Sequence, residues 1–451
     1  MSRLRNTVRQ SAFLAAAVFA TACSMTADSL TDSNAAVIGY ASSNNPTNWW
    51  REIGGGSLDA LVNEALKNSP TIEVLAARVE VARADARLLT AASQPSISAG
   101  AASQFGERQE FETGGERASA MRYSGDARFA WELDFWGRVK QLRQGSRRQV
   151  DAAFADEDAG RLLLISEIAR LDLSRRRLAS EEKVIAATLE ANSESVERLR
   201  EKQRAGIIDN NLADRQSAAG DALEREIDEL RRKRQLAELA LDRLLGRDPG
   251  TSDWPSAPAI PSLPALPKFV KTELLAKRPD IRAATARVAA SWHLSRAATL
   301  DLLPKLRFTG LATGRAMRLS PSIDEWIAQV APTLEVPIWD PVRRANAKGS
   351  SARAKLAAAE YREKVLRAFE ETAVALTNLS AQENIQHSAD ASAASLRTVY
   401  RRTQEKFASG VVSQLEVLED QRRALEAKRA ALQAKESRLA AWIDLKKAMG
   451  G

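Results

Sequence analysis

The sequence predicts a mainly α-helical protein that carries a smaller β part and uses one structural unit twice. Apolar and polar residues alternate from Gly125 to Phe135, which is typical of a β-strand with one apolar face. A helix-favouring pattern without proline runs from Arg138 to Ala205. Motifs of the first half then recur in order in the second half, which indicates a tandem duplication.

The recurring motifs set the expected domain boundaries. The segment 69–72 matches 278–281, and Pro95 matches Pro304 at the same separation. The segment 131–137 matches 334–340, and Gly206 matches Gly410. We therefore expect a first repeat at residues 49–250, a proline-rich linker at 251–267 and a second repeat at 268–451, each with helices, two strands and a long helical hairpin.

The N-terminus predicts export from the cytoplasm. Residues 1–22 form a signal peptide, with three arginines followed by an apolar stretch too short to span a bilayer. The segment Ala20-Thr21-Ala22 fits an ordinary secretory cleavage site, but small residues before Cys23 also resemble the bacterial lipoprotein signal, in which leucine usually stands where this chain has Ala20. Cys23 is the single cysteine of the chain and has no disulfide partner, so we favour lipid attachment there, with residues 23–48 as a polar tether.

The alternating stretch fits a membrane strand. Its apolar positions are Phe129, Trp131, Leu133 and Phe135. The charged positions between them, expected to tune ion preference from the inside of a channel, are Asp126, Arg128, Glu132 and Asp134. A strand covering a soluble core is the common alternative, but a length of about 10 residues matches a tilted strand that crosses a bilayer. A second strand is expected from Pro95, and a further pair in the second repeat, ending with 326–338.

Four such strands cannot close a membrane barrel alone, because the smallest barrels have about eight strands. Open strand edges are not tolerated in lipid, so the strands must close by oligomerisation, and either two or three copies satisfy this. The long helices, on the order of 100 Å, then continue the barrel as a tube. Leucines at heptad spacing in the last helix predict coiled-coil packing: Leu418, Leu425, Leu432 and Leu439.

Composition argues against other classes. The net charge of +8 could suggest nucleic acid, but Lys and Arg alternate with Asp and Glu throughout, so we expect no nucleic-acid partner. His293 and His387 lie far apart and neither has metal-ligand spacing. Lys348-Gly349-Ser350 has the wrong order for a phosphate-binding loop. We expect no enzyme activity, cofactor or metal, and no transmembrane helix after the N-terminus.

Four motifs resemble those of the outer-membrane efflux proteins, the channel component of tripartite pumps, in their nodulation-T-like lipoprotein branch. They are Trp131-Glu132-Leu133-Asp134-Phe135-Trp136-Gly137-Arg138, Arg278-Pro279-Asp280-Ile281-Arg282-Ala283-Ala284, Pro337-Ile338-Trp339-Asp340 and Ala448-Met449-Gly450-Gly451. The resemblance covers essentially the whole chain after the signal peptide. It implies a lipid-anchored homotrimer in the bacterial outer membrane, with a twelve-stranded barrel and a helical tunnel through the periplasm.

The same resemblance implies partners and site residues. An inner-membrane transporter and a periplasmic adaptor (membrane fusion) protein would deliver drugs, toxic compounds or metals to this passive duct. Gly206 and Gly410 match the periplasmic turns that the adaptor contacts, although each could simply end a helix. Glu416 and Glu419 match acidic residues that narrow the closed entrance, although acidic residues on a helix are usually solvated surface. Their mutual repulsion in a trimer would make the gate easy to open.

Two other functions stay open at this point. A protein-secretion outlet shares the architecture, and the sequence does not separate it from an efflux duct. A non-channel exported coiled-coil scaffold would also need the long helices, but it would not need the strand pairs 125–135 and 326–338.

Overall fold

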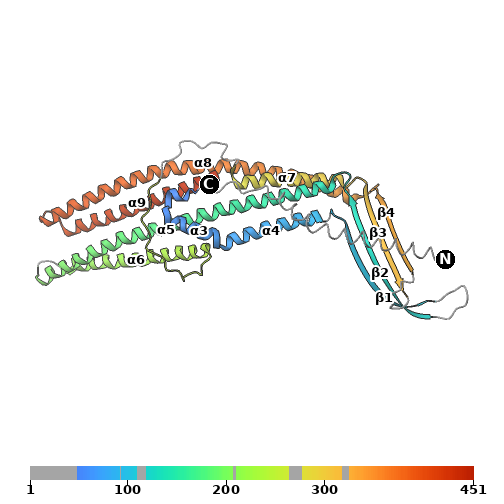
Figure 1. The fold of residues 1–451 in the computed structure, drawn as a ribbon. Coiled ribbons are helices and arrows are strands. Elements are labelled where there is room, and N and C mark those ends of the chain that lie inside the picture. Colours follow the sequence, from blue (N-terminus) through green and yellow to red (C-terminus); the bar gives the residue numbers. More distant parts are fainter. Residues whose placement is uncertain (1–47, 92, 109–117, 207–209, 264–276, 317–324) are drawn as a thin grey trace. The chain divides into compact units, whose positions relative to one another are not determined.

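The computed structural model describes residues 48–91, 93–108, 118–206, 210–263, 277–316 and 325–451 (Figure 1). The described residues of the segment from Asn48 to Gly451 belong to one compact unit. Cys23, the predicted lipid-attachment residue, lies outside the described residues.

Matching elements follow one another in the two halves. The first half has α3 (Trp50–Asn68), α4 (Pro70–Ala91), β1 (Ser96–Arg108), β2 (Ala118–Leu133), α5 (Arg138–Arg204) and α6 (Asn210–Leu245). The second has α7 (Pro279–Leu300), β3 (Lys305–Ala316), β4 (Glu325–Glu335), α8 (Pro341–Ala408) and α9 (Gln414–Met449). Helices α4 and α7 both have 22 residues, α5 and α8 have 67 and 68, and α6 and α9 both have 36. The tandem repeat predicted from the sequence is therefore confirmed.

The four strands form one antiparallel sheet in the order β1-β2-β3-β4 (Figure 1). Strands β2 and β3 pair the two repeats, with Trp131 opposite Phe308. In this sheet β1 and β4 are the edge strands, each with one unpaired side among the described residues.

The prediction that Phe135 belongs to the membrane strand was wrong, because β2 ends at Leu133. The next residue, Asp134, accepts hydrogen bonds from the backbone N–H groups of Val139 (2.9 Å) and Lys140 (2.8 Å). Its carboxylate thus satisfies orphan donors in the first turn of α5 and turns the chain from strand to helix. The alternation of apolar and polar residues in the sequence continues past Asp134, but the extended conformation of the backbone does not.

The helices pack as two antiparallel hairpins, α5 with α6 and α8 with α9, and α9 also packs on α5. The largest core joins α3, α5, α6, α8 and α9, and the rings of Trp49 and Trp442 meet edge to face at 5.7 Å within it. Of the heptad leucines, Leu439 is buried in this core and Leu432 packs against it. Leu425 packs against a second, smaller cluster nearer the turns. The predicted seam of α9 is thus a packing surface.

A buried polar cluster holds the linker and α3 on the long helix α5. Asp172 pairs with Arg175 (3.2 Å) and Arg176 (2.7 Å), and all three side chains are buried. Arg176 also donates to Ser57 of α3 (2.8 Å), and Arg175 donates to the carbonyl of Pro255 (3.1 Å) and lies over the ring of Trp254. These contacts offset part of the cost of burying the charges, although the Nε of Arg175 is buried without a hydrogen-bond acceptor.

Candidate functional site: the amphipathic sheet and the hairpin turns

The strand register separates apolar from charged residues across the whole sheet. Residues opposite each other on neighbouring strands share a face, so Ile97, Phe129, Gly310 and Val330 lie in one row. The same face carries Ala99, Ala101, Phe105, Ala127, Trp131, Leu133, Leu306, Phe308, Ala312, Trp326, Ala328 and Leu334. Among them Phe105, Trp326 and Val330 are 69%, 65% and 74% exposed. A continuous apolar surface of this kind suits contact with lipid.

The opposite face is mainly polar, with Leu311 and Ile327 as its large apolar members. Its charged members are Asp126, Arg128, Glu132, Lys305, Arg307, Arg315 and Glu335. Asp134 was expected with them but lies in the turn after β2, where it caps α5. Of the predicted membrane-strand residues, the sheet therefore brings together Phe129, Trp131 and Leu133, and Trp131 stacks on Phe308 at 6.1 Å. Phe135 is 69% exposed and contacts Trp136 instead.

A network of charges that the motif analysis missed joins the sheet to the helices. Asp301 lies within 2.7 Å of Lys305, 3.5 Å of Arg138 and 3.8 Å of Arg343. Partial burial pushes the pKa of Asp301 up, but the hydrogen bond and the positive charge of Lys305, together with the two arginines, hold that pKa below its ordinary value. Arg138 pairs in turn with Glu132 (2.6 Å). The sequence did carry a sign of this network, because charged residues stand at each strand–helix junction in both repeats.

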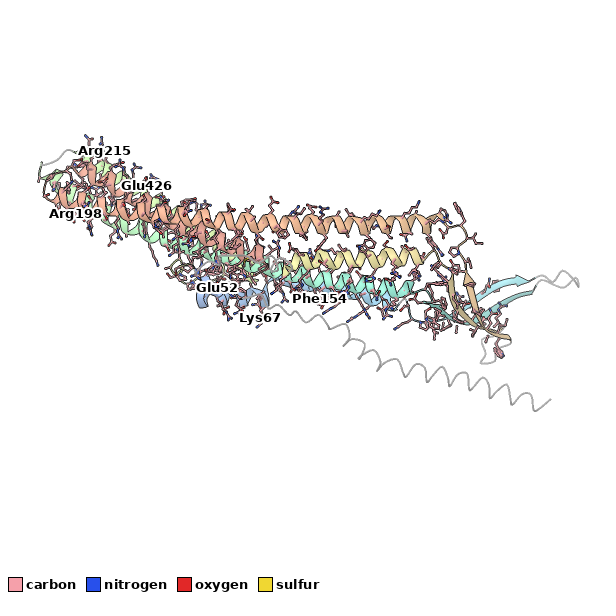
Figure 2. The ribbon with its side chains drawn as sticks, turned by 90° about the horizontal axis from the view of Figure 1, so that it is seen from above. Glu52, Lys67, Phe154, Arg198, Arg215 and Glu426 are labelled. Atoms are coloured by element: carbon pink, nitrogen blue, oxygen red, sulfur yellow. The ribbon has the colours of Figure 1, made fainter. Side chains whose placement is uncertain are left out.

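Both predicted glycines lie at hairpin turns. Gly206 and Gly410 have φ values of +68° and +73°, and at either one a Cβ atom would find no neighbour within 4 Å. A left-handed residue is needed there to end the helix, and only glycine adopts it without strain. Near the turns Gln414 donates to Ser195 (3.2 Å) and Lys202 lies over the ring of Phe407 (5.8 Å), so the two hairpins lie side by side. Figure 2 shows Arg198 and Glu426 on their neighbouring helices.

The two predicted gate residues differ in their surroundings. Glu419 pairs with Arg422 (3.0 Å) and Arg423 (3.2 Å), and the hydrogen bond from Arg422 lowers the pKa of the Glu419 carboxyl. Glu416 is exposed in the first turn of α9, and its N–H donates to the hydroxyl of Ser413 (3.4 Å). In the described part of the chain Glu416 has no ion pair.

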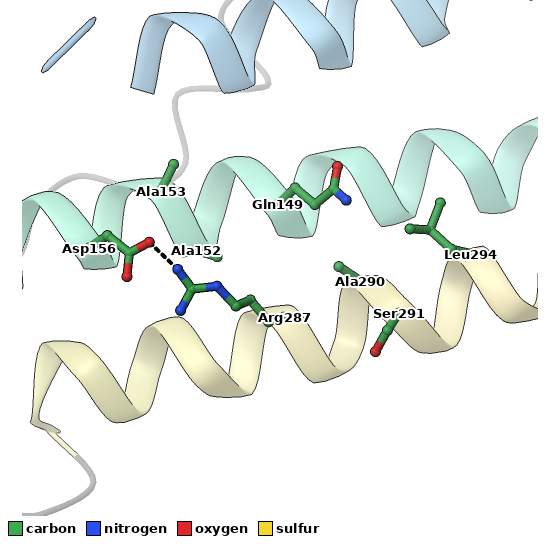
Figure 3. Close-up of a pocket in the computed structure, with 8 residues that line it drawn as sticks. All are labelled: Gln149, Ala152, Ala153, Asp156, Arg287, Ala290, Ser291 and Leu294. Carbon is green, nitrogen blue, oxygen red and sulfur yellow. Dashed lines mark hydrogen bonds and ion pairs between the residues drawn. The ribbon is translucent and has the colours of Figure 1, made fainter. Parts of the chain in front are cut away.

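A pocket of about 330 Å³ lies between α5 and α7 (Figure 3). Alanines line much of it, and an ion pair between Asp156 of α5 and Arg287 of α7 crosses it. Within the described ranges there is no cluster of three or more His, Cys, Asp or Glu side chains arranged to hold a metal ion. Nor does any described helix have the length and apolar character needed to cross a membrane.

The family model described as outer membrane efflux protein matches residues 61–247 and again residues 270–451. The chain belongs to this family. Each match covers one repeat, so the two halves are related to the same unit. This efflux protein is accordingly an outer-membrane channel component of an efflux system.

Named relatives span most of the chain. Outer membrane protein OprJ of Pseudomonas aeruginosa is 29% identical over 421 residues, which cover 89% of this chain and 86% of OprJ. Pyoverdine export outer membrane protein OpmQ of Pseudomonas putida is 28% identical over 416 residues, covering 89% of this chain and 87% of OpmQ. The solved structure of the outer-membrane channel OprN superposes with a TM-score of 0.81 at 27% identity, covering 89% of this chain and 92% of OprN.

Proposed function

We propose that this efflux protein works as a homotrimeric, passive duct that carries small molecules such as drugs, toxic compounds or metals from an inner-membrane transporter and a periplasmic adaptor to the cell exterior. The observation that carries the proposal is the sheet, with one face apolar across all four strands and the other charged. Lipid on one side and an aqueous lumen on the other account for both faces.

The open edges of the sheet support assembly from several copies. The unpaired sides of β1 and β4 would leave backbone N–H and C=O groups without partners in lipid. Pairing β4 of one copy with β1 of the next closes the sheet, and three copies supply twelve strands. A closed ring also places the charged faces around a common channel.

The hairpin turns are the proposed contact site of the adaptor. Beside Gly410 two apolar side chains are exposed, Val411 at 71% and Leu415 at 56%. Exposed apolar residues at a turn suit a protein partner better than water. Gly206 marks the equivalent turn of the first hairpin, so a trimer offers the adaptor six turns of two kinds.

The entrance gate is proposed at Glu416 and Glu419. Glu419 already has two arginine partners within its own hairpin, so its charge is partly compensated. Glu416 is therefore the stronger candidate for repulsion between copies, because like charges brought together by symmetry disfavour the closed state. At the other end of the chain, Cys23 is proposed to carry the lipid that anchors the protein in the outer membrane.

Negative-stain imaging of the detergent-extracted mature protein tests the proposal. Threefold cylinders well over 100 Å long, the helical length with the barrel added, are expected. Planar-bilayer recordings of the same preparation should show an ion-conducting pore that opens less often in Glu416→Gln, because this variant lacks the repulsion between copies. Thin rods or monomers that leave the membrane without detergent would contradict the duct and favour an exported coiled-coil scaffold.

A further inference from the structure

The mixing of positive and negative side chains along the sequence is interrupted at the start of both long helices. Residues 138–150 of α5 contain five Lys or Arg and no Asp or Glu, and residues 341–359 of α8 contain five and none as well. These ten positive charges exceed the net charge of +8 of the whole chain. Both stretches begin where the sheet ends, just after β2 and β4 (Figure 1). The excess positive charge of the protein is therefore concentrated at the junction of sheet and helices.

Positive charge at this position is unfavourable for the helices themselves. The N-terminal end of a helix carries a partial positive charge, so acidic side chains stabilise its first turn and cations do not. Neither α5 nor α8 has an acidic residue in its first turn. Four exposed cations in the first ten residues of these helices, here called the junction cations, have no ion-pair partner among the described residues: Lys140, Arg147, Arg344 and Lys348. A negatively charged partner outside the chain would offset this cost.

On α5 the junction cations lie opposite the polar face of the sheet. Arg138 turns toward that face, because it pairs with Glu132 at 2.6 Å. Successive residues of a helix are about 100° apart, so Lys140 and Arg147 lie about 180–200° round the helix from Arg138. They are therefore on the side of the apolar face, which is the side proposed to contact lipid.

A similar arrangement recurs on α8. Arg343 pairs with Glu335 of the polar face. Arg344 and Lys348 lie about 100–140° round the helix from Arg343, so they too are turned away from the polar face. The guanidinium of Arg344 lies over the ring of Trp339, 4.6 Å from its centre. This stacked pair is at the surface, because Trp339 is 75% exposed.

A rim of exposed apolar side chains lies between the sheet and the junction cations. After β4 it contains Ile338, Trp339 and Val342, which are 86%, 75% and 76% exposed. After β2 it contains Phe135 and Trp136, which are 69% and 48% exposed. Aromatic side chains gather where the hydrocarbon of a bilayer gives way to its headgroups, and Lys and Arg just beyond them are attracted to anionic lipid. The order of apolar face, aromatic rim and cations matches the layers of one bilayer leaflet.

We infer that the junction cations bind the anionic headgroups of the phospholipids in the leaflet that borders the helices. The inference rests on the duct proposed above, in which the apolar face of the sheet contacts lipid. Lys140 and Arg344 precede Gly206 and Gly410 by the same 66 residues, so each repeat contributes to the site. In a closed ring of copies the junction cations surround the barrel and hold it at a fixed depth in the membrane.

Distance separates the junction cations from two others on α8. At a rise of 1.5 Å per residue, the junction cations lie within about 14 Å of the start of their helices, whereas Arg353 and Lys355 lie about 18–21 Å along α8. A headgroup layer is about 5–8 Å thick, and the attraction beyond it falls off over a Debye length of about 8 Å. Arg353 and Lys355 are also exposed and have no ion-pair partner among the described residues. They are therefore matched controls.

Lipid retention by the intact protein tests the inference. Native mass spectrometry of the detergent-extracted protein, with phosphatidylglycerol and phosphatidylcholine added in equal amounts, should show preferential retention of phosphatidylglycerol. The quadruple variant Lys140→Gln/Arg147→Gln/Arg344→Gln/Lys348→Gln should lose that preference. Each single variant should reduce it by up to about fivefold, as expected for one cation near an anionic surface. The control Arg353→Gln/Lys355→Gln and the charge-conserving Lys140→Arg/Lys348→Arg should both retain it.

Three outcomes would overturn the inference in distinguishable ways. Displacement of phosphatidylglycerol by an equal concentration of inorganic phosphate would show that the cations bind any phosphate group rather than a lipid. A quadruple variant that retains phosphatidylglycerol like the wild type but shifts the reversal potential of the pore in a salt gradient would place the cations in the lumen and leave the duct intact. A wild-type protein that neither conducts ions nor inserts into vesicles of either lipid would overturn the duct as well.

Discussion

The long helices α5 and α8 come from equivalent positions of the two repeats but have very different surroundings. Helix α5 packs against α4, α6, α7 and α9 and buries residues along most of its length. Helix α8 packs mainly against α7 and α9 and buries Ala354, Ala368, Thr372, Ala375 and Leu379. Leu162 of α5 is 7% exposed, whereas its equivalent in α8, Leu366, is 60% exposed.

This difference shows that burial in a duplicated chain depends on which neighbours a repeat has, rather than on its own sequence. Helix α5 of the first repeat lies between other elements of its own repeat and elements of the second repeat. The second repeat has one flank, along α8, against which the main contacts of the described residues place no other element. Matched substitutions at equivalent positions test whether the contrast holds.

The largest effect is expected in the buried helix. Leu162→Ala should lower the free energy of unfolding by about 3 kcal/mol, because it removes a buried side chain and leaves a cavity. Leu366→Ala should cost well under 1 kcal/mol in a dissociated chain. Urea denaturation in detergent, followed by circular dichroism, measures both. Equal losses in dissociated chains would show that α8 is as well packed as α5.

A similar comparison applies to the two faces of the sheet. Val330→Arg, on the apolar face of β4, should destabilise insertion by about 2–4 kcal/mol, because the charge would enter lipid. Gln329→Arg, one residue earlier on the polar face, should be close to neutral. Folding into lipid vesicles, monitored by protease protection, distinguishes the two. If both variants inserted equally well, the apolar face would not be facing lipid.

The two turns provide a smaller and symmetric effect. Gly206→Ala and Gly410→Ala should each cost about 1–2 kcal/mol, because alanine in the left-handed region is strained even in open space. Hydrogen exchange of the adjoining helix ends should rise equally in both variants. A loss confined to Gly410→Ala would mean that the two turns are not equivalent.

The smallest effect concerns acid stability at the junction of sheet and helices. Because its cationic neighbours keep the pKa of Asp301 below its ordinary value in the folded protein, Asp301 stabilises the fold above its unfolded pKa of about 3.9. That contribution is lost as the pH falls through the lower folded pKa. Thermal stability should therefore fall below about pH 4, and less steeply in Asp301→Asn, which is already less stable at pH 7. Parallel pH profiles for the two proteins would exclude this role.

Local sequence was enough to predict the repeat, the long helices, the turn glycines and the apolar face of β2, because each depends on periodicity or on residues with special backbone preferences. It placed Phe135 in the strand because alternation carries no information about where Asp134 caps the next helix. Which helices became buried and which charges met was settled by tertiary packing. Asp301 joins cations that lie far away in the sequence, and Leu162 and Leu366 differ only in their neighbours. Such contacts depend on how the two repeats pack together, which no local pattern records.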